Sequence, residues 1–285
     1  MLVKKESWRC FDGTLSVFEH PSQACNCDMR FGVFTPPPQQ HGQSRRWPVL
    51  WYLSGLTCTW ENVMTKAGLQ RTAAALGLMI IAPDTSPRGD DVPDDQAYDL
   101  GKGAGFYLTA TQQPWAKHYR MDQYITDELQ RVVAENFREA DLTRQGITGH
   151  SMGGHGALTL HLKHPQRYRS VSAFSPIVAP SQVPWGQKAF TAYLGSDRAS
   201  WQRYDATELV KKQPSAAHIL IDQGAADQFL ERELQPQRFV AAADAAGQKV
   251  TLRMQEGYDH SYYFVSTFID DHLRWHAQAL GEPSQ

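Results

Sequence analysis

The sequence has little of what marks membrane proteins, nucleic-acid-binding proteins and disulfide-stabilised proteins. Its most apolar run, residues 76–82, is far shorter than the roughly 18 residues of a membrane span. Its 28 basic and 30 acidic side chains nearly balance, so we expect no binding of nucleic acid or of an anionic membrane. The four cysteines are too few and too unevenly spaced for a disulfide framework, and they lack the paired spacing of a zinc site: Cys10, Cys25, Cys27 and Cys58.

The chain also lacks an apolar segment after the two lysines near its start, so no signal peptide is predicted. Together with the sparse cysteines, this favours a cytoplasmic protein whose thiols stay reduced. In contrast, hydrophobic residues make up 41% of the 285 residues, which is enough for a large core and argues against disorder. Because no linker or internal repeat divides the sequence, we predict one domain over residues 1–285.

The order of the expected elements points to an α/β fold. Apolar and β-branched segments predict strands over 14–19, 29–35, 48–53, 78–82, 146–148, 171–174, 218–222 and 250–254. Helical spacing predicts helices over 65–76, 121–137, 153–164, 231–246 and 262–280. The segments 36–46 and 86–117 are expected to be loops, and the second is long enough to indicate a functional role. We therefore predict a mostly parallel sheet with an antiparallel N-terminal part and helices on both faces.

The most informative motif is Gly149-His150-Ser151-Met152-Gly153, which matches G-x-S-x-G. It lies between an expected strand end and an expected helix rich in small residues. This is the setting of a nucleophile elbow, which holds a serine at the tip of a strained turn. The alternatives are a phosphate-binding turn or a plain strand–helix junction, and the absence of a P-loop lysine argues against the first. Ser151 is thus the predicted nucleophile.

A nucleophilic serine needs a base and a group that orients the base, in the chain order Ser, acid, His. His260 follows the last expected strand and precedes the last helix, so it is the predicted base. Two acids compete near the preceding strand: Asp222 lies within it, whereas Asp227 follows in a turn. We predict Asp227, because a carboxylate in a turn can face His260, and we give little weight to the adjacent Asp259.

Backbone N–H groups should stabilise the oxyanion. The N–H of Met152 opens the helix after the nucleophile, and the N–H of Leu56 lies in the loop 54–59 after an earlier strand. Cys58 belongs to the same loop. We considered Cys58 as an alternative nucleophile, but it has no elbow, and a thiol beside the pocket that can be oxidised or capped is the better interpretation.

Together these residues resemble the esterase D family, the S-formylglutathione hydrolases. The resemblance rests on three long motifs and extends along nearly the whole chain: Ser54-Gly55-Leu56-Thr57-Cys58-Thr59, Gly149-His150-Ser151-Met152-Gly153-Gly154-His155-Gly156 and Gly257-Tyr258-Asp259-His260-Ser261-Tyr262-Tyr263. It implies an α/β-hydrolase fold, no metal or other cofactor, a cytoplasmic and often dimeric enzyme, and cleavage of S-formylglutathione and of short carboxylic esters. By motif, the triad of the family falls on Ser151, Asp227 and His260.

A formyl group is the smallest acyl group, so the resemblance also implies a tight acyl pocket. The candidate pocket residues are Cys58, Trp60, His150, Trp185 and Tyr263. Three other functions stay open from the sequence: a general carboxylesterase or acyltransferase on the same fold, a binding protein that has kept the fold, and a cysteine-dependent enzyme. The residues that bind the glutathione moiety cannot be chosen among the 28 basic side chains.

Overall fold

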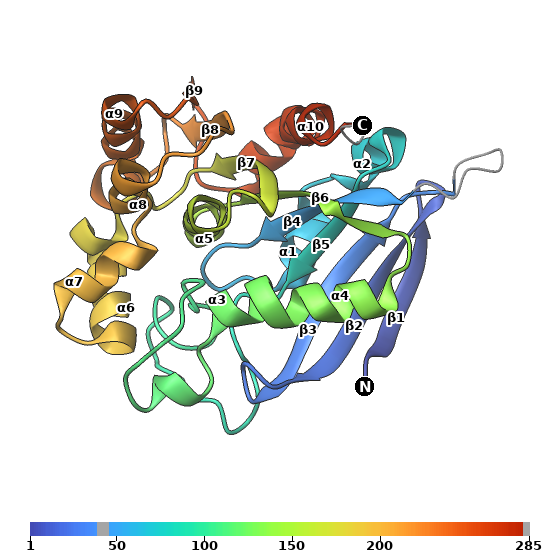
Figure 1. The fold of residues 1–285 in the computed structure, drawn as a ribbon, viewed down its shortest axis with the longest axis horizontal. Coiled ribbons are helices and arrows are strands. Elements are labelled where there is room, and N and C mark those ends of the chain that lie inside the picture. The colour runs from blue at the N-terminus through green and yellow to red at the C-terminus, as the bar shows by residue number, and fades with distance from the viewer. Residues whose placement is uncertain (39–45, 282–285) are drawn as a thin grey trace.

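The computed structural model describes residues 1–38 and 46–281, so most of the loop expected over 36–46 lies outside the described residues. The strands form one twisted sheet in the order β1-β2-β3-β5-β4-β6-β7-β8-β9 (Figure 1). The bounds are β1 (Val3–Cys10), β2 (Gly13–Ser22), β3 (Cys27–Thr35), β4 (Trp47–Leu53), β5 (Met79–Pro83), β6 (Ala140–Gly149), β7 (Tyr168–Phe174), β8 (Ile219–Gly224) and β9 (Val250–Gln255). Strands β1, β2, β3 and β5 pair antiparallel, and all pairs from β5 and β4 to β9 are parallel. The predicted mixed α/β sheet is thereby confirmed.

Helices cover both faces of this sheet (Figure 1). Their bounds are α1 (Trp60–Lys66), α2 (Gln70–Leu76), α3 (Met121–Gln123), α4 (Leu129–Asn136), α5 (Met152–Lys163), α6 (Pro184–Leu194), α7 (Arg198–Trp201), α8 (Ala206–Lys212), α9 (Pro236–Ala246) and α10 (Tyr262–Ala279). A π-helical turn over Tyr124–Glu128 joins α3 to α4. Helices α1, α2 and α10 pack on one face, and α4, α5, α6, α8 and α9 contribute to the core on the other.

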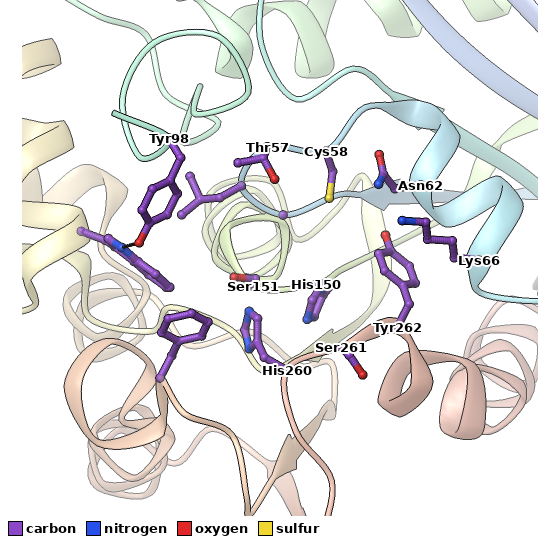
Figure 2. Close-up of a pocket in the computed structure, with 14 residues that line it drawn as sticks. Thr57, Cys58, Asn62, Lys66, Tyr98, His150, Ser151, His260, Ser261 and Tyr262 are labelled. Atoms are coloured by element: carbon purple, nitrogen blue, oxygen red, sulfur yellow. Dashed lines mark hydrogen bonds between the residues drawn. The ribbon is translucent and has the colours of Figure 1, made fainter. Parts of the chain in front are cut away.

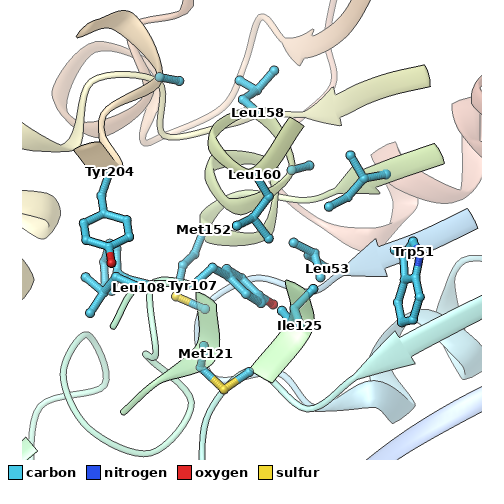
Figure 3. Packing of buried hydrophobic residues seen from close by; sticks show 14 of the residues in the cluster. Trp51, Leu53, Tyr107, Leu108, Met121, Ile125, Met152, Leu158, Leu160 and Tyr204 are labelled. Carbon is cyan, nitrogen blue, oxygen red and sulfur yellow. The ribbon is translucent and has the colours of Figure 1, made fainter. Parts of the chain in front are cut away.

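The central strands are apolar on both sides, and their side chains divide between two cores. In β4, Trp51 and Leu53 join the core beneath α5, whereas Leu50 and Tyr52 join the core beneath α10. Figure 3 shows the first core, in which Leu160 of α5 points toward Leu53 and Leu158 lies on the opposite side of the same helix. This division follows from the two-residue period of a strand, and it explains why these strands appear as continuous apolar runs.

The structure differs from the expected elements at several helices and at one strand. The single helix expected over 65–76 is broken into α1 and α2 at Gly68, whose φ of +71° is incompatible with a helix. The helix expected over 231–246 begins at Pro236, because proline has no N–H to continue a helix from the preceding turn. Strand β1 and the short helices α6 and α8 were not expected; β1 is an edge strand exposed on both sides, so its sequence carries no apolar alternation.

The segment 86–117 is irregular apart from a short 3-10 turn at Trp115–Lys117, as predicted. It is nevertheless well packed. The Tyr107 hydroxyl donates to the Ser54 carbonyl at 2.7 Å, and the Gly103 carbonyl accepts from the Thr57 N–H at 2.9 Å. A side chain at Gly103 would lie only 3.0 Å from the Thr57 backbone. The long segment therefore holds the loop 54–59 in place beside the carboxyl ends of β4 and β6.

Candidate active site

Ser151 lies at the tip of a sharp turn between β6 and α5. Its φ of +59° and ψ of −118° are unfavourable for a residue with a side chain, which is the strain expected of a nucleophile elbow. The Ser151 N–H donates to the Phe174 carbonyl at 2.9 Å, and the Ser151 carbonyl accepts from the His155 N–H at 3.0 Å. Neighbouring strand and helix thus hold the strained turn from both sides.

The two glycines of the motif permit close packing of this turn. A Cβ atom at Gly153 would lie 1.9 Å from the Leu53 carbonyl oxygen, and one at Gly149 would lie 2.3 Å from the Gly153 carbonyl oxygen. Both distances are far below any real carbon–oxygen contact. The spacing of the motif is therefore explained by the approach of β4, β6 and α5 at one point.

His260 lies in the loop between β9 and α10, and its Nδ1 donates to Asp227 Oδ2 at 2.5 Å. The Asp227 carboxylate also accepts the Phe229 N–H at 2.9 Å and the Gln223 amide at 3.3 Å. Because a carboxylate only accepts, this arrangement keeps the proton of neutral His260 on Nδ1 and leaves Nε2 free as a base. Ser151 and His260 line the same cavity (Figure 2), and no hydrogen bond joins their side chains in the described part of the chain, a looseness common in unliganded hydrolases.

The competing carboxylate, Asp222, is occupied elsewhere. It accepts from the Arg253 guanidinium at 2.5 and 2.6 Å and contacts His272 Nε2 at 3.2 Å. Burial opposes its ionisation, but the hydrogen bonds from His272 and Arg253 outweigh this and lower the pKa of Asp222. His272 also contacts Ser172, so Ser172, His272 and Asp222 have the same composition as a catalytic triad. All three are fully buried, so a substrate cannot reach them, and they connect α10 to the sheet.

The two N–H groups expected to stabilise the oxyanion, those of Met152 and Leu56, belong to the elbow and to the loop that packs against it. Met152 is the first residue of α5, whose leading N–H groups have no partner within the helix. The Leu56 N–H makes no hydrogen bond to any described residue, whereas the neighbouring Thr57 and Cys58 N–H groups are both engaged. Gly55 brings this loop against the elbow, since a Cβ atom there would lie 3.1 Å from that of Ser151. Two free N–H groups thus lie on either side of the serine.

A cavity of about 350 Å³ opens over the serine (Figure 2). Three of the five predicted pocket residues line it, namely Cys58, His150 and Trp185. The other two do not. Trp60 faces a different cavity, on the far side of α1, and Tyr263 is 84% exposed. Tyr262 lines the cavity in place of Tyr263, because α10 starts at Tyr262 and successive helical residues point about 100° apart.

The structure adds lining residues that the sequence did not indicate: Asn62, Lys66, Tyr98 and Phe229. Tyr98 comes from the long segment 86–117, and its hydroxyl accepts the Trp185 indole N–H at 2.9 Å. The Trp185 ring lies 4.6 Å from that of Phe229, which in turn lies 5.1 Å from His260. The unusual length of the Tyr98 segment was the one signal for it in the sequence.

Two further side chains in the cavity could compete for the catalytic roles, and neither is suited to them. Burial and the nearby His260 hold the pKa of His150 well below its usual range, so its ring is neutral. Burial also raises the pKa of the Cys58 thiol, which disfavours the nucleophilic thiolate. These properties favour Ser151 over Cys58 as the attacking group.

Within residues 1–38 and 46–281, no group of three or more His, Cys, Asp or Glu side chains is arranged to hold a metal ion. No helix in these ranges combines the length and the apolar character required to cross a membrane. All four cysteines are free thiols.

Comparison with known proteins places these features in a family. Residues 22–275 match the esterase family described as Putative esterase. An S-formylglutathione hydrolase of Paracoccus denitrificans is 55% identical over 273 residues, covering 96% of each chain. A solved S-formylglutathione hydrolase of Agrobacterium tumefaciens superposes with a TM-score of 0.94 at 51% identity, over 98% of this chain and 99% of that one. The serine hydrolase FphF of Staphylococcus aureus, with a TM-score of 0.73 at 18% identity over 93% and 98% of the two chains, shares the fold. The chain therefore belongs to this esterase family of hydrolases, and its resemblance to the S-formylglutathione hydrolases is confirmed.

Proposed function

We propose that this chain hydrolyses S-formylglutathione to formate and glutathione, with Ser151 as nucleophile, His260 as base and Asp227 as the orienting acid. The observation that carries the mechanism is the His260–Asp227 hydrogen bond of 2.5 Å beside a strained serine in one cavity. The names of the two relatives that are more than half identical support the substrate. The same site would also cleave short carboxylic esters.

The geometry suits a two-step acyl transfer. His260 Nε2 takes the Ser151 hydroxyl proton as Oγ attacks the formyl carbon, and the Leu56 and Met152 N–H groups hold the oxyanion. The carbon–sulfur bond then breaks, and the glutathione thiolate takes the proton from His260. Water next gives a proton to His260 and attacks the formyl-serine; formate leaves, and Ser151 recovers its proton.

The decisive experiment compares kcat/KM for S-formylglutathione with kcat/KM for p-nitrophenyl acetate, a neutral simple ester. A clear preference for the thioester supports the proposal. A clear preference for the simple ester would instead identify a general carboxylesterase, and transfer of the formyl group to an added alcohol in preference to water would identify an acyltransferase.

The acyl side of the cavity is expected to be limited by the hydrogen-bonded Tyr98–Trp185 pair. Tyr98, Trp185 and Phe229 also line a second cavity of about 290 Å³, so together they form a wall between the two spaces. Trp185→Ala should open this wall. Since each buried methylene is worth about 0.8 kcal/mol, kcat/KM for p-nitrophenyl butyrate relative to acetate should rise by roughly tenfold.

Trp185→Phe is the matched control, because it removes the indole N–H but keeps most of the ring in place. It should leave the butyrate-to-acetate ratio close to that of the wild type. Equal ratios in Trp185→Ala and the wild type would show that this wall does not limit the acyl group.

Two further properties belong to the proposal. The four free thiols and the glutathione-dependent substrate favour a cytoplasmic enzyme. The homodimer that the family resemblance implies stays a prediction, and light scattering of the purified chain would test it. No nucleic acid, membrane, metal or other cofactor enters the proposed mechanism.

A further inference from the structure

The cavity over Ser151 has two chemically different sides. Tyr98 lies on one side, with Trp185 and Phe229 packed against it. Cys58, Asn62, Lys66 and Tyr262 lie on the other side, as Figure 2 shows. Leaving group and acyl group extend in opposite directions from the carbonyl carbon that Ser151 attacks. The aromatic side suits the acyl group, so the polar side is available to the thiol part of the substrate.

This polar side carries a positive charge without a counter-charge. Among residues 1–38 and 46–281, Lys66 is the only lysine or arginine that lines the cavity, and no aspartate or glutamate in these ranges lines it. Several other lysines pair with carboxylates, among them Lys163 and Lys188, whereas Lys66 forms no ion pair with any described residue. The charge of Lys66 is also close enough to Cys58 to oppose, in part, the rise in the pKa of that thiol that burial causes. An anionic ligand at this side would be favoured.

Neighbouring side chains offer hydrogen bonds that the protein itself does not use. Asn62 lies one turn before Lys66 on α1; its Oδ1 accepts the Thr59 N–H at 2.9 Å, and its Nδ2 donates to no described residue. The Tyr262 hydroxyl and both ring nitrogens of His150 are buried and make no well-formed hydrogen bond to a described residue, but Ser54 and Tyr52 lie beside the Tyr262 hydroxyl and the His260 backbone lies beside His150. The Asn62 Nδ2 group is therefore the donor on this side that remains for a polar ligand.

We infer that Lys66, assisted by the Asn62 amide, binds a carboxylate of the glutathione moiety and thereby selects anionic thioesters. This inference rests on the proposed function, since it names the site for the leaving group of that substrate. Glutathione is suited to such a site because it carries two carboxylates at neutral pH. Lys66 contacts only the leaving thiol in this scheme, so it is a binding residue, and its loss should raise KM rather than lower kcat.

The test measures two quantities in Lys66→Met: KM for S-formylglutathione, and the inhibition constant of S-methylglutathione against p-nitrophenyl acetate hydrolysis. S-Methylglutathione is a thioether that cannot be hydrolysed, so it reports binding alone. Both constants should rise by about five- to tenfold, as for an ion pair at the mouth of a cavity, with kcat near that of the wild type. The diamide of S-methylglutathione, in which neutral amides replace both carboxylates, should inhibit the wild type and Lys66→Met equally.

Two more variants make the result specific. Asn62→Asp keeps an oxygen that can cap α1 but replaces the amide donor with a negative charge, so it should weaken S-methylglutathione binding as well. Lys249→Met removes an equal charge at the start of β9, far from the carboxyl ends of the strands, and should change neither constant. Lys66→Arg should keep most of the binding that Lys66→Met loses.

Unchanged constants in Lys66→Met, or equal changes in Lys66→Met and Lys249→Met, would overturn the assignment of Lys66. A different result would contradict the proposed function: the wild-type protein would cleave p-nitrophenyl acetate but not S-formylglutathione. In that case the inhibition constants of S-methylglutathione and its diamide still decide whether Lys66 binds a carboxylate.

Discussion

Ser151→Ala is expected to lower kcat for S-formylglutathione and for p-nitrophenyl acetate by about 10⁶-fold, as loss of the nucleophile does in other serine hydrolases. The reason is that the two rival nucleophiles in the cavity are poorly activated: the lowered pKa of His150 makes its ring a weak base and nucleophile, and the raised pKa of the Cys58 thiol disfavours the thiolate. The measurement is steady-state turnover with mass spectrometry of the trapped acyl-enzyme, which should place the acyl group on Ser151 in the wild type and on no residue of the variant.

The matched control is Cys58→Ser, which exchanges the other nucleophilic atom in the cavity for a hydroxyl. It should retain turnover within about an order of magnitude, because Cys58 contributes its backbone and its volume to the pocket and not its thiolate. The opposite pattern, with Ser151→Ala active and Cys58→Ser inactive, would establish a cysteine-dependent enzyme. Loss of activity with a thiol reagent would not establish a cysteine-dependent enzyme, since a reagent attached to Cys58 would block the cavity.

Asp227→Asn is expected to lower kcat by about 10⁴-fold, as replacement of the triad acid does elsewhere. In the wild type, the His260 Nδ1–H group donates a hydrogen bond to Asp227 Oδ2. An amide in this position can present its NH2 group to Nδ1, which favours the tautomer with the proton on Nε2 and removes the base. The affinity for S-methylglutathione should stay near that of the wild type, because Asp227 does not line the cavity.

Asp222→Asn is the control for this prediction, because it makes the same chemical change at the competing carboxylate. It should cost less than about tenfold in kcat but about 2–3 kcal/mol in the free energy of unfolding, since Arg253 and His272 lose a charged partner. The folded state lowers the pKa of Asp222, so its stabilisation is present above the pKa of the unfolded carboxyl, about 3.9, and is lost as the pH falls. A larger loss of kcat in Asp222→Asn than in Asp227→Asn would exchange the two roles.

Much of the site could be predicted because it depends on local sequence. The elbow is specified by two glycines and a serine within five residues, and the contacts at Gly149 and Gly153 show why no other residue fits. The chain order of Ser151, Asp227 and His260 follows from their positions after β6, β8 and β9, because carboxyl ends of parallel strands share one edge. Expected strands were likewise found wherever an apolar run was buried on both faces.

Other features could not be predicted, because they depend on which segments meet in space. Asp222 and Asp227 are both acids near the end of one strand, and only the approach of Arg253 and His272 shows that the first is engaged in the core. The sequence predicts Trp60 and Tyr263 as walls of the acyl pocket, but each lies on a helix that directs its side chain away from the cavity. Edge strand β1 has no buried face, and therefore no pattern that a sequence could reveal.

The sequence by itself determined the fold class, and it predicted the nucleophile and the order of the catalytic groups, because backbone geometry and strand order follow from short-range patterns of glycine and apolar residues. Only the tertiary structure decided the walls of the cavity and the surroundings of each charge. The sequence alone does not distinguish among the 28 basic side chains. Lys66 stands out because the fold places it in the wall of the cavity that contains Ser151, where no carboxylate is present among the described lining residues. Charge–charge interactions depend on distance and burial, which are properties of the folded chain.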